Sequence, residues 1–526
     1  MEHKHIKHME KAMEKSRIEQ VRFGLGLIFI LGIMLYTASQ SGGEVSITLV
    51  IAAMVGGYMA MNIGANDVAN NVGPAVGSRA LTLGSALVIA AIFEAAGAII
   101  AGGEVVGTIR SGIINPALIP DTDTFVWIMM AALMAGALWL NIATATGAPV
   151  STTHSIVGAV LGAGIAASGT EIVNWGKMGE IAMSWVISPV MGGIVAAGFL
   201  YLIKRSITYQ TDMIGAARRV VPWLVALMAW TFTTYLLLKG LGKIMKVSVM
   251  DASLYGLAMA VAVFFFLRWR LAQPDRVLAE GKQGVNSLFT IPLIFAAALL
   301  SFAHGSNDVA NAIGPLAAIV DVYTTGAGSV HADAPIPLWV MLIGALGIAL
   351  GLALYGPKVI RTIGTEITEL DQMRAYCIAM SATITVIIAS QMGMPVSSTH
   401  IAVGGVFGVG FLREYLKKNY DRMMAEIKAH HPEGDQEAIE AFISRFARAD
   451  IATKDAMLRD LKARAKIDQD PAHFSKLERK GLRKVYRHEL VKRSQLMRIA
   501  AAWVITVPAT AVMAALIFFM IRGMVA

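Results

Sequence analysis

The sequence has a single cysteine, Cys377, among 526 residues. One thiol excludes a disulfide framework and a cysteine-based metal centre. Charge is also scarce, since only 15% of the residues are charged whereas 56% are hydrophobic. A soluble chain of this length would divide into several domains, each with a polar surface. The scarcity of charge therefore favours a protein that lies in a lipid bilayer.

What the sequence does have is apolar runs of the ~20 residues that cross a bilayer core. Hydropathy gives about 13 such spans, so we predict an all-α polytopic membrane protein. Small residues fill the runs, as expected where helices pack closely in lipid. The spans begin near residues 23, 47, 80, 126, 151, 182, 220, 251, 287, 338, 375, 397 and 500.

Positive charge gathers in loops that fall on one side when the spans alternate. The positive-inside rule assigns that side to the cytoplasm. We therefore expect an integral plasma (inner) membrane protein with a cytoplasmic N-terminus and an extracytoplasmic C-terminus. The net charge of +9 lies in these loops, which makes a nucleic-acid partner a poor interpretation. Lys239, Lys243 and Lys246 are exceptions that fall on the outer side.

Two segments fall outside this pattern of spans. The polar stretch 413–498 carries helical patterning and is predicted to be a cytoplasmic insertion, either a solvated helical region or a regulatory module. A basic tail also precedes the first span. The predicted division is a tail 1–22, an extra span 23–43, a first repeat 44–204, linker spans 205–285, a second repeat 286–412, the insertion 413–498 and a last span 499–526.

The two halves of the chain are duplicates. Residues 64–74 read GANDVANNVGP and residues 305–315 read GSNDVANAIGP. Farther on, residues 149–154 read PVSTTH and residues 395–400 read PVSSTH. A weaker pair, WVISP from Trp185 and WVITVP from Trp503, follows in the same order. Recurrence in one order indicates a gene duplication.

The second half is predicted to be inverted in the membrane. Each repeat holds about five spans and two linker spans separate them, so an odd number of crossings reverses the second copy. Inverted repeats with broken or re-entrant helices are typical of secondary transporters, whose sites lie near the midplane. The duplication therefore favours a transport path over a receptor or scaffold.

The first motif pair suits a cation. Asp and Asn side chains three and four residues apart can converge on one helix face. Flanking Gly and Pro residues favour a helix break that would expose backbone carbonyls. A buried carboxylate needs a partner, and Na⁺ would supply it, whereas the plainer interpretation is helix capping. The candidate coupling-cation residues are Asn66, Asp67, Asn70, Asn307, Asp308 and Asn311.

The second motif pair suits an anion. Pro149 and Pro395 can each start a helix, whose free N–H groups and dipole attract negative charge. Hydroxyls follow in both motifs, and neither contains Lys or Arg, which would hold an anion too tightly for transport. Ordinary helix capping is the alternative. The candidate anion-binding residues are Ser151, Thr152, Thr153, Ser397, Ser398 and Thr399.

Three further titratable residues are secondary candidates. His154 and His400 close the two hydroxyl motifs and could bind substrate or simply pack. Glu94 lies inside an apolar run and needs a partner across the bundle. Glu104 and Arg110 lie nearer the outer end and are weaker candidates for gating.

Together the two duplicated motifs resemble the inorganic phosphate transporter family, over roughly residues 47–412 and the final span. The resemblance implies an inverted-repeat fold with phosphate between the Ser/Thr motifs and coupling cations near the two NDVAN copies. Glu94 matches a glutamate in the family's IFE segment, here residues 92–94. Many members also carry a glutamate in the span before the second Ser/Thr motif, where this sequence has no acidic residue from Arg374 to Met380.

The resemblance implies a secondary active transporter that imports inorganic phosphate together with Na⁺, preferred here over H⁺. No cofactor is expected, and a homodimer is compatible with the sequence. The alternative within transport is a sulfate or other oxyanion permease, and a passive channel is a third reading. An enzyme acting on phosphorylated lipids would need a nucleophile or metal cluster with a supporting base, and no such constellation is found. We therefore do not expect an enzyme.

Overall fold

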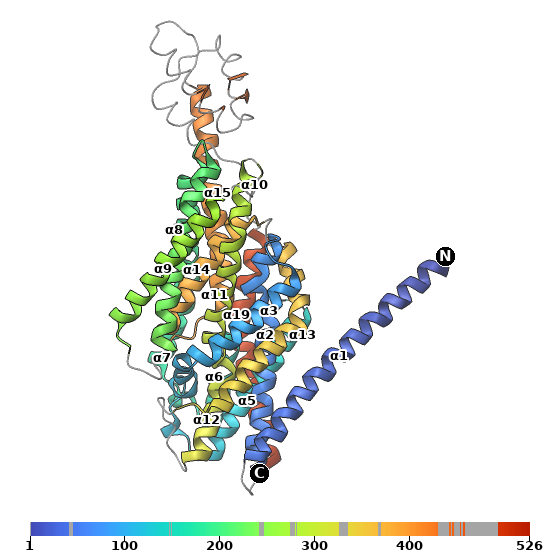
Figure 1. Ribbon diagram of the computed structural model, residues 1–526. Coiled ribbons are helices and arrows are strands. Elements are labelled where there is room, and N and C mark those ends of the chain that lie inside the picture. The colour runs from blue at the N-terminus through green and yellow to red at the C-terminus, as the bar shows by residue number, and fades with distance from the viewer. Residues whose placement is uncertain are drawn as a thin grey trace.

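The structure is a computed structural model that describes residues 2–40, 46–146, 148, 150–240, 247–273, 279, 281–325, 335–366, 370–429, 493–525 and a few residues between 441 and 457. Within these ranges every regular element is a helix, as predicted, apart from one isolated bridge between Ile114 and Val173. Figure 1 shows a long bundle from which the first helix diverges. Most of the predicted insertion 413–498 lies outside the described residues.

The helices of the first repeat and its preceding span follow the predicted order. Helix α7 contains Pro189 and ends at Ile203, directly before the basic loop that the sequence places in the cytoplasm. The bounds are α1 Glu2–Gln40, α2 Ile47–Gly77, α3 Leu83–Ala101, α4 Gly103–Gly107, η1 Thr108–Gly112, η2 Pro116–Leu118, α5 Thr122–Thr146, α6 Thr152–Ser168, η3 Thr170–Ile172, α7 Trp175–Ile203 and η4 Lys204–Thr208.

The linker helices and the second repeat complete the bundle. The bounds are α8 Met213–Lys239, α9 Val249–Ala272, α10 Lys282–Leu288, α11 Thr290–Asp308, α12 Ala310–Thr325, α13 Leu338–Glu366, α14 Gln372–Gln391, α15 Ser398–Ala429 and α19 Arg493–Val525. Helix α15 therefore continues past residue 412, and α19 begins before residue 499.

Eleven described helical segments are long and apolar enough to cross a membrane, two fewer than the predicted 13. The two that drop out are the helices that begin at the Ser/Thr motifs, α6 and α15. Each is instead the return arm of a hairpin, α5–α6 in the lower half of Figure 1 and α14–α15 in the upper half. A hairpin that enters and leaves the bundle at the same end adds no membrane crossing. The expected inverted orientation of the second repeat relative to the first is therefore unaffected.

The two hairpins meet tip to tip. The hydroxyl of Thr153, in the first turn of α6, donates to the backbone carbonyl of Val396 at 2.9 Å. Each return arm then packs on a helix of the other repeat, because a Cβ at Gly162 of α6 would strike Ala511 of α19, and one at Gly408 of α15 would strike Gly193 of α7. The repeats are therefore interlocked rather than side by side.

Glycines mark the same crossing in both repeats. A Cβ at Gly64 would collide with the backbone carbonyl of Ile348, and one at Gly305 would collide with that of Glu94. These contacts join α2 to α13 and α3 to α11. Close backbone approach through small residues holds helices together in lipid. The crossing also makes Glu94 and Ile348 equivalent positions of the two repeats.

Alanine at these crossings should destabilise the protein. We expect Gly64→Ala and Gly305→Ala each to lower stability by about 1–3 kcal/mol, the usual cost of overpacking, because backbone atoms cannot give way. Gly73→Ala, in the same helix as Gly64, is the control, since nothing lies within 4 Å of its added Cβ. Thermal denaturation of detergent-purified protein measures the difference. Equal melting temperatures for Gly64→Ala and Gly73→Ala would contradict the crossing.

The first motif copy differs from prediction. Both NDVAN copies were expected at a helix break, but α2 runs unbroken through Asn66, Asp67 and Asn70. In the second copy α11 ends at Asp308 and α12 begins at Ala310, but Val309 keeps a right-handed helical backbone and its N–H bonds the Gly305 carbonyl at 3.4 Å, so no clear break separates the two helices. Gly and Pro after the motif were read as breakers, yet Pro74 falls in the last turn of α2, too late to interrupt the motif.

Candidate functional site

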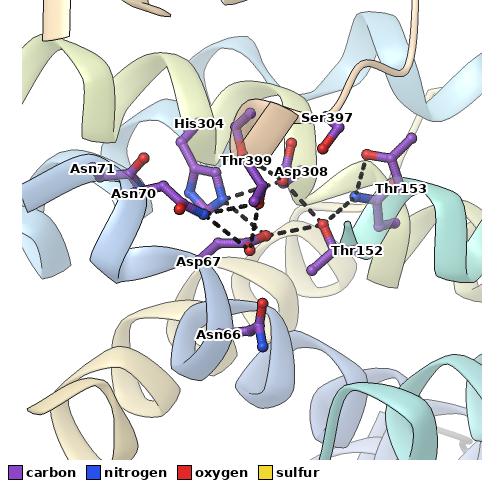
Figure 2. Close-up of polar contacts among 12 residues, drawn as sticks. Asn66, Asp67, Asn70, Asn71, Thr152, Thr153, His304, Asp308, Ser397 and Thr399 are labelled. Atoms are coloured by element: carbon purple, nitrogen blue, oxygen red, sulfur yellow. Dashed lines mark hydrogen bonds and ion pairs between the residues drawn. The ribbon is translucent and has the colours of Figure 1, made fainter. Parts of the chain in front are cut away.

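Two aspartates from opposite repeats meet in the centre of the bundle. Asp67 of α2 and Asp308 at the end of α11 are both fully buried. The Thr152 hydroxyl contacts both, at 3.0 Å from Asp67 Oδ2 and 3.1 Å from Asp308 Oδ2, as Figure 2 shows. Because a hydroxyl carries one proton, it can donate to only one carboxylate at a time. Thr152 thus couples the acidic residues of the two repeats.

Each NDVAN motif bonds the Ser/Thr motif of the other repeat. The Asn70 amide donates to Thr399 Oγ1 at 2.8 Å, and Thr399 donates to Asp67 Oδ1 at 3.2 Å. In the mirror relation, the Asn311 amide donates to the hydroxyls of Thr152 and Thr153, both at 3.2 Å. Ser398 also donates to Asp308 Oδ2 at 3.3 Å, within its own repeat. The predicted cation and anion residues therefore form one network.

The outer asparagines of the motifs have a different environment. The Asn307 amide donates to Ser390 Oγ at 2.9 Å and to the Met394 carbonyl at 3.2 Å. The Asn66 amide contacts Thr144 Oγ1 at 3.2 Å. Thr144 and Ser390 occupy equivalent positions before the two Ser/Thr motifs. Both asparagines therefore tether the hairpin tips that carry the hydroxyls.

The first serine of each Ser/Thr motif caps a helix. Ser151 Oγ accepts the His154 N–H at 3.1 Å, and Ser397 Oγ accepts the His400 N–H at 3.2 Å. Ser151 also lies 2.7 Å from His154 Nδ1. The capping alternative raised by the sequence thus holds for these two side chains. The hydroxyls of Thr152, Ser398 and Thr399 contact the aspartates instead, and that of Thr153 bonds the Val396 carbonyl.

The two motif histidines pack in a stack of rings. His154 stacks on Trp185 with centroids 3.8 Å apart, and His400 lies against Trp503 at 3.6 Å. The two imidazoles are 4.4 Å apart. These ring contacts fit the packing role that the sequence analysis considered for the two histidines. The stack also pairs each tryptophan of the weakest repeat motif with the histidine of its own repeat.

His304 is a site residue that sequence reasoning missed. Its Nε2 lies 3.2 Å from Asp308 Oδ2 and 3.5 Å from Asp67 Oδ2, and its Nδ1 lies 3.1 Å from Glu94 Oε2. Asn71 in turn donates to Glu94 Oε1 at 2.7 Å. The signal was present, because His304 lies one helical turn before Asp308 and inside an apolar run. Glu94 therefore has the cross-bundle partner that its position demanded.

The hydrogen-bonded series Asn71, Glu94 and His304 has no counterpart in the other repeat. The residue equivalent to His304 in the first repeat is Ile63, and the residue equivalent to Asn71 in the second is Ala312. Glu94 is matched by Ile348 across the equivalent helix crossing. The three polar residues therefore have apolar residues at the equivalent positions of the other repeat.

The arrangement can hold both signs of charge. Ligand atoms of Asp67, His304 and Asp308 lie within 4.8 Å of one another, close enough to share a cation. Helices α6 and α15 begin beside them, and their first-turn N–H groups attract anions. Two carboxylates and an anion in one buried site repel one another strongly unless a cation accompanies them. Binding of the two ions would thus be interdependent.

The weaker outer candidates lie away from this cluster. Glu104 pairs with Lys239 at 2.7 Å, which gives one of the exceptional outer lysines a partner. Arg110 pairs with Asp321 of α12 at 2.7 Å, and both side chains are buried.

Comparison with known proteins assigns the chain to a group. Residues 63–514 match the phosphate transporter family. A Helicobacter pylori protein that carries the name phosphate permease is 50% identical over 527 residues, which is 98% of each chain. A Pyrococcus abyssi protein with the same name is 41% identical and covers 69% of this chain and 89% of its own length.

A solved structure named for the sodium-dependent phosphate transporter is also similar. It shares 30% of the sequence and superposes with a TM-score of 0.72. The match covers 90% of this chain and 99% of the other. Fold, length and motifs therefore agree with the same group of proteins.

Proposed function

The chain belongs to the phosphate transporter family, and from that premise we propose that it imports inorganic phosphate as a symporter driven by Na⁺. Membership confirms the resemblance drawn from the two motif pairs, and it makes the protein a transporter rather than an enzyme. The coupling ion, the direction of transport and the roles of individual residues are parts of the proposal.

One observation carries the proposal: a single hydroxyl joins two buried aspartates at the point where two helix N-termini meet. Phosphate would bind at the hairpin tips, through hydroxyls and first-turn N–H groups. Thr152, Thr153, Ser398 and Thr399 would contact it, while Ser151 and Ser397 would shape the helix ends as caps.

Electrostatic interactions would couple the binding of Na⁺ to the binding of phosphate. Phosphate next to Asp67 and Asp308 is unfavourable until positive charge joins them, because the site would otherwise hold three anionic groups. Each ion therefore favours binding of the other, which is the thermodynamic basis of symport. The proposed coupling-cation ligands remain Asn66, Asp67, Asn70, Asn307, Asp308 and Asn311, with His304 beside them.

The same geometry bears on the sulfate alternative. Asp67 and Asp308 are hydrogen-bond acceptors that lie directly beside the Ser/Thr hydroxyls. Phosphate near neutral pH retains a proton that it can donate to such a carboxylate, whereas sulfate can only accept. Buried acceptors therefore favour phosphate as the substrate.

Purified protein in proteoliposomes tests the proposal. Labelled phosphate should accumulate when an inward Na⁺ gradient is imposed, and an H⁺ gradient alone should give little uptake. Excess unlabelled sulfate should leave uptake unchanged. Uptake that follows the H⁺ gradient would replace Na⁺ by H⁺, and uptake without any gradient would indicate a channel.

Membrane orientation and domain limits complete the proposal. We propose the N-terminus on the cytoplasmic side of the inner membrane and the C-terminus outside. Lys358 and Arg361, near the end of α13, and the start of the insertion would then face the cytoplasm together, as the positive-inside rule requires. The repeats are proposed at 44–204 and 286–412, closed by the last span.

A further inference from the structure

A short segment after helix α4 joins the first repeat to the second at one end of the bundle. This segment, residues 108–110, begins η1. The Thr108 hydroxyl donates to the backbone carbonyl of Gly393 at 2.8 Å. Ile109 packs on Gly314 of α12 so closely that a Cβ at this glycine would lie 2.6 Å from the isoleucine side chain. Both contacts cross from one repeat to the other.

A buried ion pair completes this junction. Arg110 Nη2 lies 2.7 Å from Asp321 Oδ2, and the two side chains are 3% and 4% exposed. Asp321 lies ~15 Å beyond Asn311 along α12, at ~1.5 Å per residue, which is about half the thickness of a bilayer core. The pair therefore lies near the end of the bundle where α12 ends, at the bottom of Figure 1, and not in the central site.

The two charges have no counterpart in the other copy of the repeat. Residues 108–112 read TIRSG, and the equivalent residues of the second repeat, 362–366, read TIGTE. Glycine therefore replaces Arg110, and Ala80 stands at the position equivalent to Asp321. The threonine and isoleucine recur, whereas the ion pair belongs to one end alone. This difference favours a role at that end over a general role in building the repeat.

The ion pair can exist in two alternative states. While this end of the bundle is closed, each buried charge needs the other, because loss of one partner would leave an uncompensated charge. If the end opens, water can hydrate both charges. Separation then costs little, because desolvation had offset most of their attraction. Such a pair fixes one arrangement of the two repeats and can still be released.

We propose that residues 108–110 are a latch that keeps this end of the transport path closed, and that the Arg110–Asp321 pair separates each time the end opens. The inference rests on the proposed function, since it assumes a path that opens at alternate ends. The proposed orientation makes this the outer end. The latch belongs to the first repeat and its partners to the second, so movement of one repeat against the other must break these contacts.

The reactivity of a cysteine behind the latch tests the inference. Ala318 is fully buried in α12, on the face that carries Asp321. Ala318→Cys, in detergent-purified protein with Cys377→Ala, should react slowly with a charged methanethiosulfonate. Asp321→Asn or Arg110→Gln should each raise the rate at least about tenfold, equivalent to ~1.4 kcal/mol, because the remaining charge favours the hydrated, open state. Both substitutions together should give a slower reaction than either alone.

Further variants serve as controls. Lys239→Gln removes the pair with Glu104, whose side chain is 50% exposed, and should change the rate less than about twofold. Cysteine at the exposed position Asp123 should react equally fast in every background. If the charge variants do not elute as monodisperse protein, Thr108→Val tests the same latch. It removes one hydrogen bond and should raise the rate about two- to tenfold.

The outcomes separate the latch from the proposed function. Equal rates with and without the Arg110–Asp321 pair would refute the latch. An equal increase after Lys239→Gln would indicate general loosening and would refute it as well. A combined variant that reacts as fast as the single variants would show that the charges do not act as a pair. The reaction requires neither phosphate nor Na⁺, so failure of phosphate uptake alone would refute the transport proposal and leave the latch intact.

Discussion

Replacing Asp308 with asparagine should abolish Na⁺-driven phosphate uptake, and Asp67→Asn should do the same. Both carboxylates are fully buried at the joint between the hairpins, where the Thr152 hydroxyl bridges them. Asparagine lacks the negative charge that would pair with the coupling cation, and loss of one partner of a buried ion pair costs about 3–5 kcal/mol, where each ~1.4 kcal/mol is a factor of ten. We therefore expect uptake to fall by roughly 100-fold or more in proteoliposomes.

Asp123→Asn is the matched control for these two variants, because Asp123 is exposed in the first turn of α5, away from the cluster. It should transport at the wild-type rate. The two site variants should still insert and elute as folded protein, since asparagine keeps the shape of aspartate. Wild-type uptake by Asp67→Asn or Asp308→Asn would remove that residue from the cation pathway.

Loss of His304 should be equally severe, but for stability as well as transport. One imidazole contacts three buried carboxylates, those of Asp67, Asp308 and Glu94. Without it the three acidic groups lose a group that contacts all of them, and only neutral donors such as the Thr152 hydroxyl and the Asn71 amide are described at their oxygens. His304→Gln should lower stability by about 3–5 kcal/mol, as expected when a buried charged group loses its partner. Thermal denaturation in detergent and phosphate uptake measure the two effects.

A second substitution distinguishes the contacts of His304 with the carboxylates from its general contribution to packing. Adding Glu94→Gln to His304→Gln removes one carboxylate from the cluster and should recover part of the lost stability without restoring uptake. Ile348→Met, at the position equivalent to Glu94, is the control and should change neither quantity. A single His304→Gln variant as stable as wild type would show that the imidazole does not hold the carboxylates together.

The sequence by itself determined the class of the protein and its internal repeat, and it supplied most residues of the candidate site. Span length is a local property, since a run of apolar residues either reaches across a bilayer or does not. The duplicated motifs are contiguous, so their recurrence can be read directly from residues 64–74 and 305–315. Asp67, Asp308 and the hydroxyls after Pro149 and Pro395 were identified in this way.

Predictions from local sequence patterns were wrong for features that depend on which helices pack together. Helices α6 and α15 both begin with apolar runs, but α6 is 17 residues long and α15 continues into charged residues, and the residues at their starts meet at the centre. The helix break predicted from the Gly-Pro pair of each motif copy likewise does not form: α2 runs through the first copy, and Val309, between α11 and α12 in the second, keeps a helical backbone.

Only the tertiary structure decided how the two repeats differ. The hydrogen bond from Thr399 to Asp67 joins residues 332 positions apart, and no local pattern encodes such a pairing. His304, Glu94 and Asn71 come from three helices, and each looks isolated in its own apolar run. Their interaction becomes evident only in the folded chain, because the energy of a buried charge depends on its partners in space rather than on its neighbours in sequence.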